Sequence, residues 1–240
     1  MDKVKYIFWD FDGTLAYRDG MWTDTLLSVL HNNGITIISK EHVKPFLNTG
    51  FTWHSPEIPH SDFFHGMKWW EYYEKYFSDI FQKLGISGEQ SKKMSKEVRA
   101  EYLNIAKWHV YDDVENALIK LSNKKYVHII LSNHVPELLG LVKKLKIDMY
   151  FEKVYSSANI GYEKPNSKIF DYVTNDLRTD KTNCIMIGDS YESDIVGALN
   201  SGIEPILVRK ENKKNYQWYC QSLKDITKVI KCLDNHLTRV

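Results

Sequence analysis

Several features that mark common protein classes are missing from this chain of 240 residues. It has three cysteines, an odd number without a C-x-x-C pair, so we expect free thiols in a reducing compartment and no disulfide framework. Basic and acidic residues nearly cancel, 32 against 31, which does not favour a nucleic-acid partner because phosphate backbones attract an excess of Lys and Arg. Neither a signal peptide nor an apolar run of membrane length is recognisable, so we expect a cytoplasmic protein without a membrane partner.

Motifs for common cofactors are missing as well. No P-loop and no G-x-G-x-x-G stretch occurs, so neither ATP hydrolysis nor a dinucleotide cofactor is indicated. A calcium loop does not fit, because the sixth and twelfth positions counted from Asp10 are Leu15 and Met21 instead of Gly and Glu. Repeats and low-complexity tracts are absent from the sequence, and no pattern indicates an oligomeric state. The chain is 43% hydrophobic, which suffices for a substantial core.

Strand and helix patterns alternate over most of the chain. Apolar runs, several of them β-branched, predict buried strands at 4–9, 126–131, 184–187 and 203–208. Amphipathic patterns predict helices at 113–122, 136–145, 167–177, 193–200 and 222–237. This alternation predicts an α/β fold with a Rossmann-like, mainly parallel sheet that carries helices on both faces.

The alternation is interrupted between the first two predicted strands. Here the periodicity is almost entirely helical, at 22–32, 39–47, 66–84 and 89–107, while 35–38 is either a short strand or a buried loop. A crossover between parallel strands usually needs about one helix, so this stretch is far too long. It predicts an inserted α-helical cap domain at 17–106, with 1–16 and 107–240 forming the Rossmann-like core.

The most informative motif is Asp10-Phe11-Asp12-Gly13-Thr14, directly after the first predicted strand. Side chains alternate between faces along a strand, so Asp10 and Asp12 should lean to the same side. Two unpaired carboxylates there would repel each other, and one would have to stay protonated. A divalent cation and an anionic substrate would make the arrangement useful, and Gly13 allows the backbone to turn sharply beside a ligand.

Polar residues also lie in the loops around the other predicted strands. Open parallel sheets bind ligands outside the carboxyl ends of their strands, so these loops should converge on the first motif. One loop carries a hydroxyl and an amide. A second loop carries a lysine before a proline. A third loop carries two carboxylates and a hydroxyl. Their residues are Ser132, Asn133, Lys164, Asp189, Ser190 and Asp194. Together they offer donors for Mg²⁺ and for a phosphoryl group.

In this order and spacing, the four motifs resemble those of haloacid dehalogenase superfamily phosphatases, in the phosphoglycolate phosphatase-like branch that has a helical cap. The resemblance spans nearly the whole chain, and Asp-x-Asp-Gly-Thr is its most specific part. It implies a phosphoric monoester hydrolase that acts on a small phosphorylated metabolite through an aspartyl-phosphate. Asp10 would be the nucleophile and Asp12 the general acid and base.

The resemblance also implies which residues bind the phosphoryl group and the metal. The phosphoryl oxygens would be held by Thr14, Ser132, Asn133 and Lys164. Mg²⁺ would be bound by Asp10, Asp189 and the Asp12 carbonyl, with Ser190 and Asp194 orienting its ligands. We expect the cap to close over this site as a lid.

Four alternatives remain open at this point. A 2-haloacid dehalogenase shares the fold, but it needs no metal and its pattern lacks an acid two residues after the nucleophile. A sugar-phosphate mutase shares all four motifs. A phosphonate hydrolase would need a cap lysine, and none of Lys40, Lys44 and Lys68 stands out. A catalytically inactive phospho-ligand-binding module is disfavoured because Asp10 and Asp12 are both present.

The segment 50–65 is rich in aromatic residues and histidine but has no helical period. It either faces the substrate or packs between cap and core, and Trp53 and His54 are its candidates for substrate specificity. Trp53 could stack on a flat group and His54 could donate to a polar one. A zinc site made of His54, His60 and His65 is a further hypothesis, although no spacing here matches a known zinc signature.

Overall fold

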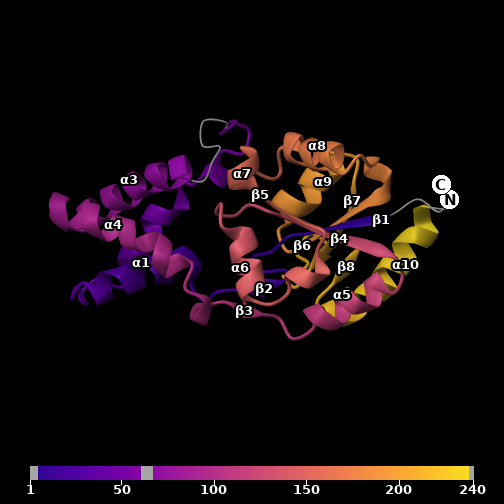
Figure 1. Cartoon of the computed structure of the whole chain (residues 1–240), viewed down its shortest axis with the longest axis horizontal. Helices are drawn as coiled ribbons and strands as arrows, with labels where there is room; N and C mark the ends of the chain where they lie inside the picture. Colours follow the sequence, from indigo (N-terminus) through magenta and orange to yellow (C-terminus); the bar gives the residue numbers. More distant parts are fainter. Residues whose placement is uncertain (1–4, 61–66, 238–240) are drawn as a thin grey trace.

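Six parallel strands form the centre of the computed structural model, which describes residues 5–60 and 67–237 (Figure 1). They are β1 (Lys5–Trp9), β4 (Tyr126–Ser132), β5 (Lys153–Ser156), β6 (Cys184–Gly188), β7 (Glu204–Val208) and β8 (Tyr219–Cys220). Their order across the sheet is β5-β4-β1-β6-β7-β8, so the chain builds outward from β1 first on one side and then on the other. The strand order therefore reverses at β1, and ligands of open α/β sheets bind at such a reversal.

Helices cover both faces of this sheet. One face packs against α5 (Val114–Ser122), α6 (Leu138–Lys144) and α10 (Ile226–Leu237), and the other against α7 (Ser157–Ile160), α8 (Ser167–Asp176) and α9 (Gly197–Asn200). Within β1, Ile7 and Trp9 belong to the first apolar cluster and Phe8 to the second. A strand buried on both faces needs an unbroken apolar run, which is why these strands were recognisable in the sequence. The predicted fold class is confirmed.

Two strands of the sheet were not predicted. In β5 only Ser156 is fully buried, and β8 has just two residues, so neither forms an apolar run. The predicted helix at 193–200 begins instead with a π-helical turn, Tyr191–Val196, which leads into α9. The first strand begins at Lys5 in the described chain, and the predicted start at residue 4 lies outside the described residues.

The inserted helical segment lies beside the sheet, at the end of the molecule opposite to the chain termini (Figure 1). It contains α1 (Met21–Asn32), α2 (Lys40–Val43), α3 (Met67–Lys83) and α4 (Gly88–Tyr102). The chain enters it through β2 (Ala16–Tyr17) and returns through β3 (His109–Val110), which pair antiparallel in a short ribbon. The alternative of a strand at 35–38 is wrong, and the helix predicted at 89–107 ends at Tyr102 before a separate 3₁₀ turn, Ile105–Lys107.

Aromatic side chains form the interior of the insert. The ring of Trp22 stacks on Tyr102 with centroids 4.1 Å apart, and Phe51 stacks on Trp53 at 4.3 Å. Behind them, Tyr73 and other aromatic residues of α3 are fully buried: Trp69, Trp70, Phe77 and Phe81. The aromatic face of α3 is therefore core, as its helical spacing predicts.

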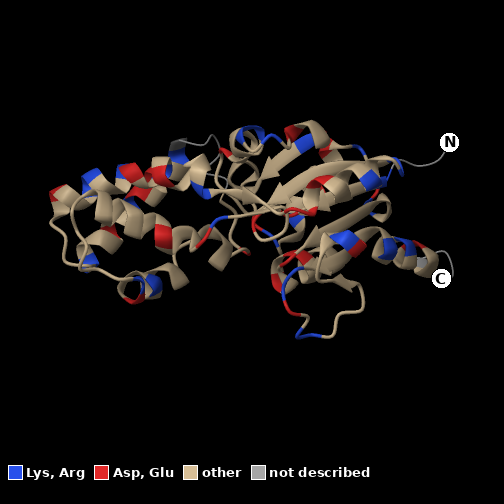
Figure 2. Cartoon of the chain, turned by 90° about the horizontal axis from the view of Figure 1, so that it is seen from below, with Lys and Arg blue, Asp and Glu red and all other residues tan. Residues whose placement is uncertain are grey.

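Charged side chains are spread over the whole molecule. Lys and Arg are interspersed with Asp and Glu on both the insert and the core (Figure 2). Within residues 5–60 and 67–237, no helix combines the length and the apolar character that a bilayer crossing requires.

Candidate active site

The first motif lies where the strand order reverses. Asp10 follows β1 directly, and its backbone N–H donates to Ile187 O at 2.9 Å, which extends the parallel pairing by one residue. The ends of β4 and β6 bring Ser132 and Asp189 to the same place. A cavity of about 330 Å³ opens there. Its lining includes every predicted catalytic, phosphate-binding and metal-binding residue except Thr14, namely Asp10, Asp12, Ser132, Asn133, Lys164, Asp189, Ser190 and Asp194.

Lys164 is the buried cation of this cavity. Its Nζ donates to Asp10 Oδ1 at 2.8 Å, to Asp194 Oδ1 at 2.6 Å and to the Leu131 carbonyl at 2.9 Å, so all three ammonium protons have acceptors. Burial by itself lowers the pKa of Lys164, but the charges of Asp10 and Asp194 and their hydrogen bonds raise it above its usual value. Lys164 is therefore a permanent cation that holds the two carboxylates together.

Asn133 braces Lys164 through the backbone. Its side-chain amide donates to Lys164 O at 2.8 Å, and its Oδ1 accepts from Lys164 N at 2.8 Å. This reciprocal pair locks the loop that carries the lysine, since both polar ends of the amide are used. The side chain of Asn133 thus positions a neighbour in this structure, whereas the sequence suggested that it would point at phosphoryl oxygens.

The Asp10 carboxylate is oriented by two hydroxyls as well as by Lys164. Ser132 Oγ donates to Asp10 Oδ1 at 2.9 Å, and Thr14 Oγ1 donates to Asp10 Oδ2 at 3.3 Å. Gly13 makes the close approach of the loop possible, because it adopts φ of +81° and a Cβ there would lie 2.4 Å from Asp189 Oδ2. Any side chain at position 13 would therefore push the Asp189 carboxylate out of place.

Three buried carboxylates converge in the cavity. Asp10, Asp189 and Asp194 each offer an oxygen within 4.8 Å of the others. Burial raises the pKa of Asp189, and the nearby charge of Asp10 adds to this rise. Burial likewise raises the pKa of Asp194, although Lys164 opposes the shift. Carboxylate oxygens are the ligands that Mg²⁺ prefers, and a divalent cation would relieve this repulsion, so the donor set fits the metal.

Asp12 does not belong to this cluster. Its Oδ1 lies 3.8 Å from His134 Nε2, and that oxygen is buried without a hydrogen-bond partner in the described part of the chain. Burial raises the pKa of Asp12 well above its usual range, with further rises from the charges of Asp10 and Asp189. The carboxyl therefore retains its proton more readily than an exposed aspartate, as a general acid must.

His134 and Tyr102 also line the cavity, and the sequence did not single them out. The Tyr102 hydroxyl lies 3.4 Å from His134 Nε2, and the imidazole packs edge-on against Phe11. Burial lowers the pKa of His134 to about 4, so the ring is neutral at physiological pH. The only available signal was that His134 follows Ser132-Asn133, and the sequence contains nothing that brings Tyr102 of α4 to the same point.

The two candidate specificity residues have different positions. Trp53 lines the cavity next to other uncharged residues of the insert, Met21, Trp22 and Tyr102. His54 is exposed and does not line it; its Nδ1 accepts from Phe51 N at 3.3 Å. Of these two residues, Trp53 lies at the cavity and His54 does not.

The zinc hypothesis finds no geometric support. The one group of His, Cys, Asp and Glu close enough to hold a metal, among the residues that the structure describes, contains neither His54 nor His60. The third histidine of the zinc hypothesis, His65, lies outside the described residues.

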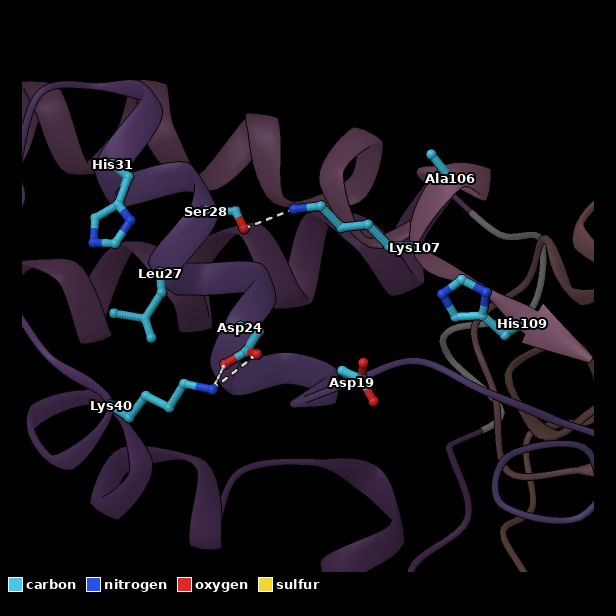
Figure 3. Close-up of a pocket in the computed structure, with 9 residues that line it drawn as sticks. All are labelled: Asp19, Asp24, Leu27, Ser28, His31, Lys40, Ala106, Lys107 and His109. Carbon is cyan, nitrogen blue, oxygen red and sulfur yellow. Dashed lines mark hydrogen bonds and ion pairs between the residues drawn. The ribbon is translucent and has the colours of Figure 1, made fainter.

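A second cavity of about 390 Å³ lies beside the β2–β3 ribbon (Figure 3). Its two lysines are already engaged. Lys40 Nζ lies 2.8 Å from Asp24 Oδ1, and Lys107 Nζ donates to Ser28 Oγ at 2.8 Å. None of the motif residues lines this cavity, and both of its lysines are engaged, so it offers no comparable set of groups for catalysis.

The amino-acid sequence is similar to known proteins. Residues 7–208 match the family model described as haloacid dehalogenase-like hydrolase. A segment of 102 residues, 42% of this chain, is 30% identical to 45% of the glyceraldehyde 3-phosphate phosphatase of Methanothermobacter thermautotrophicus. A segment of 141 residues is 30% identical to the 5-amino-6-(5-phospho-D-ribitylamino)uracil phosphatase YigB of Escherichia coli and covers 57% of both chains. The matches span about half the length of these relatives.

The fold is similar to solved structures as well. The putative hydrolase YfnB from Bacillus subtilis, whose crystal structure is described as bound to magnesium, superposes with a TM-score of 0.70. The match covers 96% of this chain and all of the other, at 14% identity. Identity this low demonstrates a shared fold and no more.

Proposed function

The chain belongs to the haloacid dehalogenase-like hydrolases, and from this premise we propose that it is a Mg²⁺-dependent phosphomonoester hydrolase that acts on a small phosphorylated metabolite. One observation carries the proposal: the Asp10 carboxylate is held by Ser132 and Lys164 beside two further buried carboxylates at the reversal of the strand order. The names of the two similar phosphatases support a phosphate ester as the substrate.

The metal would be held by Asp10, Asp189 and the Asp12 carbonyl, with Ser190 and Asp194 supporting these ligands. Asp194 is suited to this because its Oδ2 accepts from Ser190 N at 2.9 Å while its Oδ1 accepts from Lys164. When bound, the metal supplies positive charge that offsets the repulsion between the carboxylates and a phosphate dianion.

Asp10 attacks the phosphorus, so that a bond forms between its carboxylate oxygen and phosphorus while the bond to the leaving alcohol breaks. Asp12 gives its proton to the leaving oxygen, then takes a proton from the water that cleaves the aspartyl-phosphate. The phosphoryl oxygens would be held by Lys164, Ser132 and Thr14, whose donors contact Asp10 in this structure. Asn133 would contribute by positioning Lys164. Catalysis rests on positioning and charge, since phosphoryl transfer needs little else from the protein.

We propose that residues 17–106 act as the cap and 1–16 with 107–240 as the catalytic core. Polar contacts join the two parts near the site. Thr52 Oγ1 donates to Glu163 Oε1 at 2.5 Å, next to Lys164, and Asn166 Nδ2 donates to Pro56 O at 2.9 Å. These contacts keep the insert over the cavity, where it excludes water from the phosphoryl group.

We also propose that the protein works in the cytoplasm, without a nucleic-acid or membrane partner. All three cysteines are free, which agrees with a reducing compartment. The near balance of charges and their interspersion (Figure 2) speak against a polyanionic partner.

The basic test is hydrolysis of 4-nitrophenyl phosphate with and without Mg²⁺. We expect phosphate release that depends on the metal and that excess chelator abolishes, because three buried carboxylates otherwise repel the substrate. Undiminished activity in excess chelator would contradict the metal-dependent mechanism.

Metal binding should also be measurable without turnover. Mg²⁺ at 100 times its Kd should stabilise the fold by about 2.7 kcal/mol, roughly 5 to 10 °C in Tm for a chain of this size. Asp189→Asn should lose most of this gain because it removes one proposed ligand, whereas the exposed Asp225→Asn should keep it. Thermal unfolding with and without Mg²⁺ measures the difference, and an equal Tm gain in all three proteins would place the metal elsewhere.

Halide release should separate this proposal from a dehalogenase. We expect no detectable chloride from 2-chloropropionate, because the cavity has four carboxyl groups, Asp10, Asp12, Asp189 and Asp194, and Lys164 is the only lysine or arginine among its described lining residues. An anionic haloacid bound without metal would meet uncompensated repulsion. Chloride release at a rate comparable with phosphate release would reverse the assignment.

A further inference from the structure

The two ends of the active-site cavity differ in charge. At the inner end lie the carboxylates and Lys164. At the outer end, the described lining residues come from the insert and are all uncharged: Met21, Trp22, Trp53 and Tyr102. The phosphoryl group belongs at the inner end, beside Asp10, so the rest of the substrate must lie against the outer end.

No cation lining the cavity in the described part of the chain is available to a second anionic group. Lys164 is committed to the inner end, where its Nζ donates to Asp10, Asp194 and Leu131 O. Arg18 lies behind Tyr102 and is bound to Glu101 Oε1 at 2.9 Å and to Tyr102 O. Lys210, outside the lining, is paired with Asp189 Oδ2 at 2.7 Å. A carboxylate or second phosphate at the outer end would be desolvated against aromatic rings without a partner.

The aromatic walls are held rigidly from behind. Trp22 stacks on Tyr102 with an angle of 11° between the rings, and Trp53 stacks on Phe51 with an angle of 10°. Tyr102 is fully buried and Phe51 nearly so, which fixes the planes of the two tryptophan rings. Trp22 is nearly buried and also stacks on Phe77, so the partly exposed Trp53 is the indole left for a ligand. A rigid indole ring favours a planar partner, since flat groups stack with the largest contact area.

From these observations we infer that the leaving group is uncharged and contains a planar ring, so that esters whose leaving group carries a carboxylate or a second phosphate are poor substrates. This inference rests on the proposed phosphatase activity and narrows its substrate class. The site would discriminate between esters mainly by binding charged leaving groups poorly, because such a substrate must bury a charge that has no partner.

A pair of nearly isosteric esters tests the charge. 4-Carbamoylphenyl phosphate and 4-carboxyphenyl phosphate have almost the same shape and differ in one negative charge. We expect kcat/KM of the purified full chain with Mg²⁺ to be at least tenfold higher for the carbamoyl ester. A ratio near one, or a preference for the carboxylate, would overturn the inference while leaving the phosphatase proposal intact. Failure to hydrolyse either ester would overturn both.

A lysine placed at the outer end should weaken the preference for the carbamoyl ester over the carboxylate ester. Met21 is half-buried in the lining, so Met21→Lys can bring an ammonium group to the carboxylate, and the ratio of the two esters should fall severalfold. Ile37→Lys adds the same charge at a site that is 88% exposed and outside this cavity, and it should leave the ratio unchanged. Equal ratios in both variants and the wild type would show that this wall does not contact the leaving group.

Planarity can be tested by binding alone. Phenylphosphonate and cyclohexylphosphonate share the anionic head and cannot be hydrolysed as esters. We expect the phenyl compound to inhibit at least threefold more tightly, and Trp53→Leu to reduce that preference because it replaces the flat ring with a branched side chain. Tyr72→Leu, at an exposed position of α3 outside the lining, serves as the control. Equal inhibition by both phosphonates in the wild type would overturn the stacking part of the inference.

Discussion

Asp10→Asn should remove phosphate release while the protein stays folded. The amide keeps the shape of the carboxyl group but is not a nucleophile, so no aspartyl-phosphate can form. Its carbonyl oxygen can still accept from Ser132 Oγ and Lys164 Nζ, which hold Asp10 at 2.9 and 2.8 Å. We expect a loss of at least about 10⁴ in kcat, since the remaining groups can only position a water molecule.

The measurement is steady-state hydrolysis of 4-nitrophenyl phosphate together with thermal unfolding. Asp225→Asn is the matched control, because it makes the same change at an exposed residue that pairs with Lys228. It should retain full activity. Full activity in Asp10→Asn would contradict the mechanism, and a collapsed Tm would show that the loss of activity came from unfolding instead.

Asp12→Asn should have the second largest effect, and its size should depend on the leaving group. Loss of proton transfer costs roughly 10² to 10⁴ in rate. An alkyl phosphate needs a proton on its leaving oxygen and should lose this factor in the first step. With 4-nitrophenyl phosphate the first step should be nearly normal, because nitrophenolate leaves without a proton. The phosphorylated enzyme should then accumulate, since the water that cleaves it has no general base.

A burst of nitrophenolate followed by slow turnover would identify this behaviour. The thermal stability of the Asp12→Asn variant is the control for misfolding. The pKa of Asp12 is raised by burial in the folded chain, so the folded state binds this proton more tightly than the unfolded state. The stability that this proton confers is fully present below the unfolded pKa and is lost as the pH rises from there through the folded pKa, and the neutral amide avoids that loss. The variant should therefore be at least as stable as the wild type at pH 7 without metal. Equal losses on both substrates would argue against proton transfer by Asp12.

The sheet and the motif loops were readable in the sequence for a local reason. The strands β1, β4, β6 and β7 are largely buried on both faces, so each appears as a mostly apolar run. Asp10, Ser132 and Asp189 stand directly at the ends of such runs. Because parallel strands place their carboxyl ends at one edge, spacing along the chain was enough to expect these side chains in one cavity.

Packing between distant segments decided the rest. Lys164 Nζ reaches Asp10 across 154 positions, and Asn133 uses its amide on the Lys164 backbone, which no local pattern indicates. Short elements such as the β2–β3 ribbon bury too little to leave a periodic signal.

The sequence by itself determined the parallel sheet, the helical insert and the set of chemical groups that meet at the edge of the sheet. Only the tertiary structure decided which of those groups touch, that His134 and Tyr102 stand beside Asp12, and that Trp53 and not His54 lines the cavity. The physical reason is that periodicity records which face of an element is buried, whereas the direction of one side chain depends on neighbours from other elements.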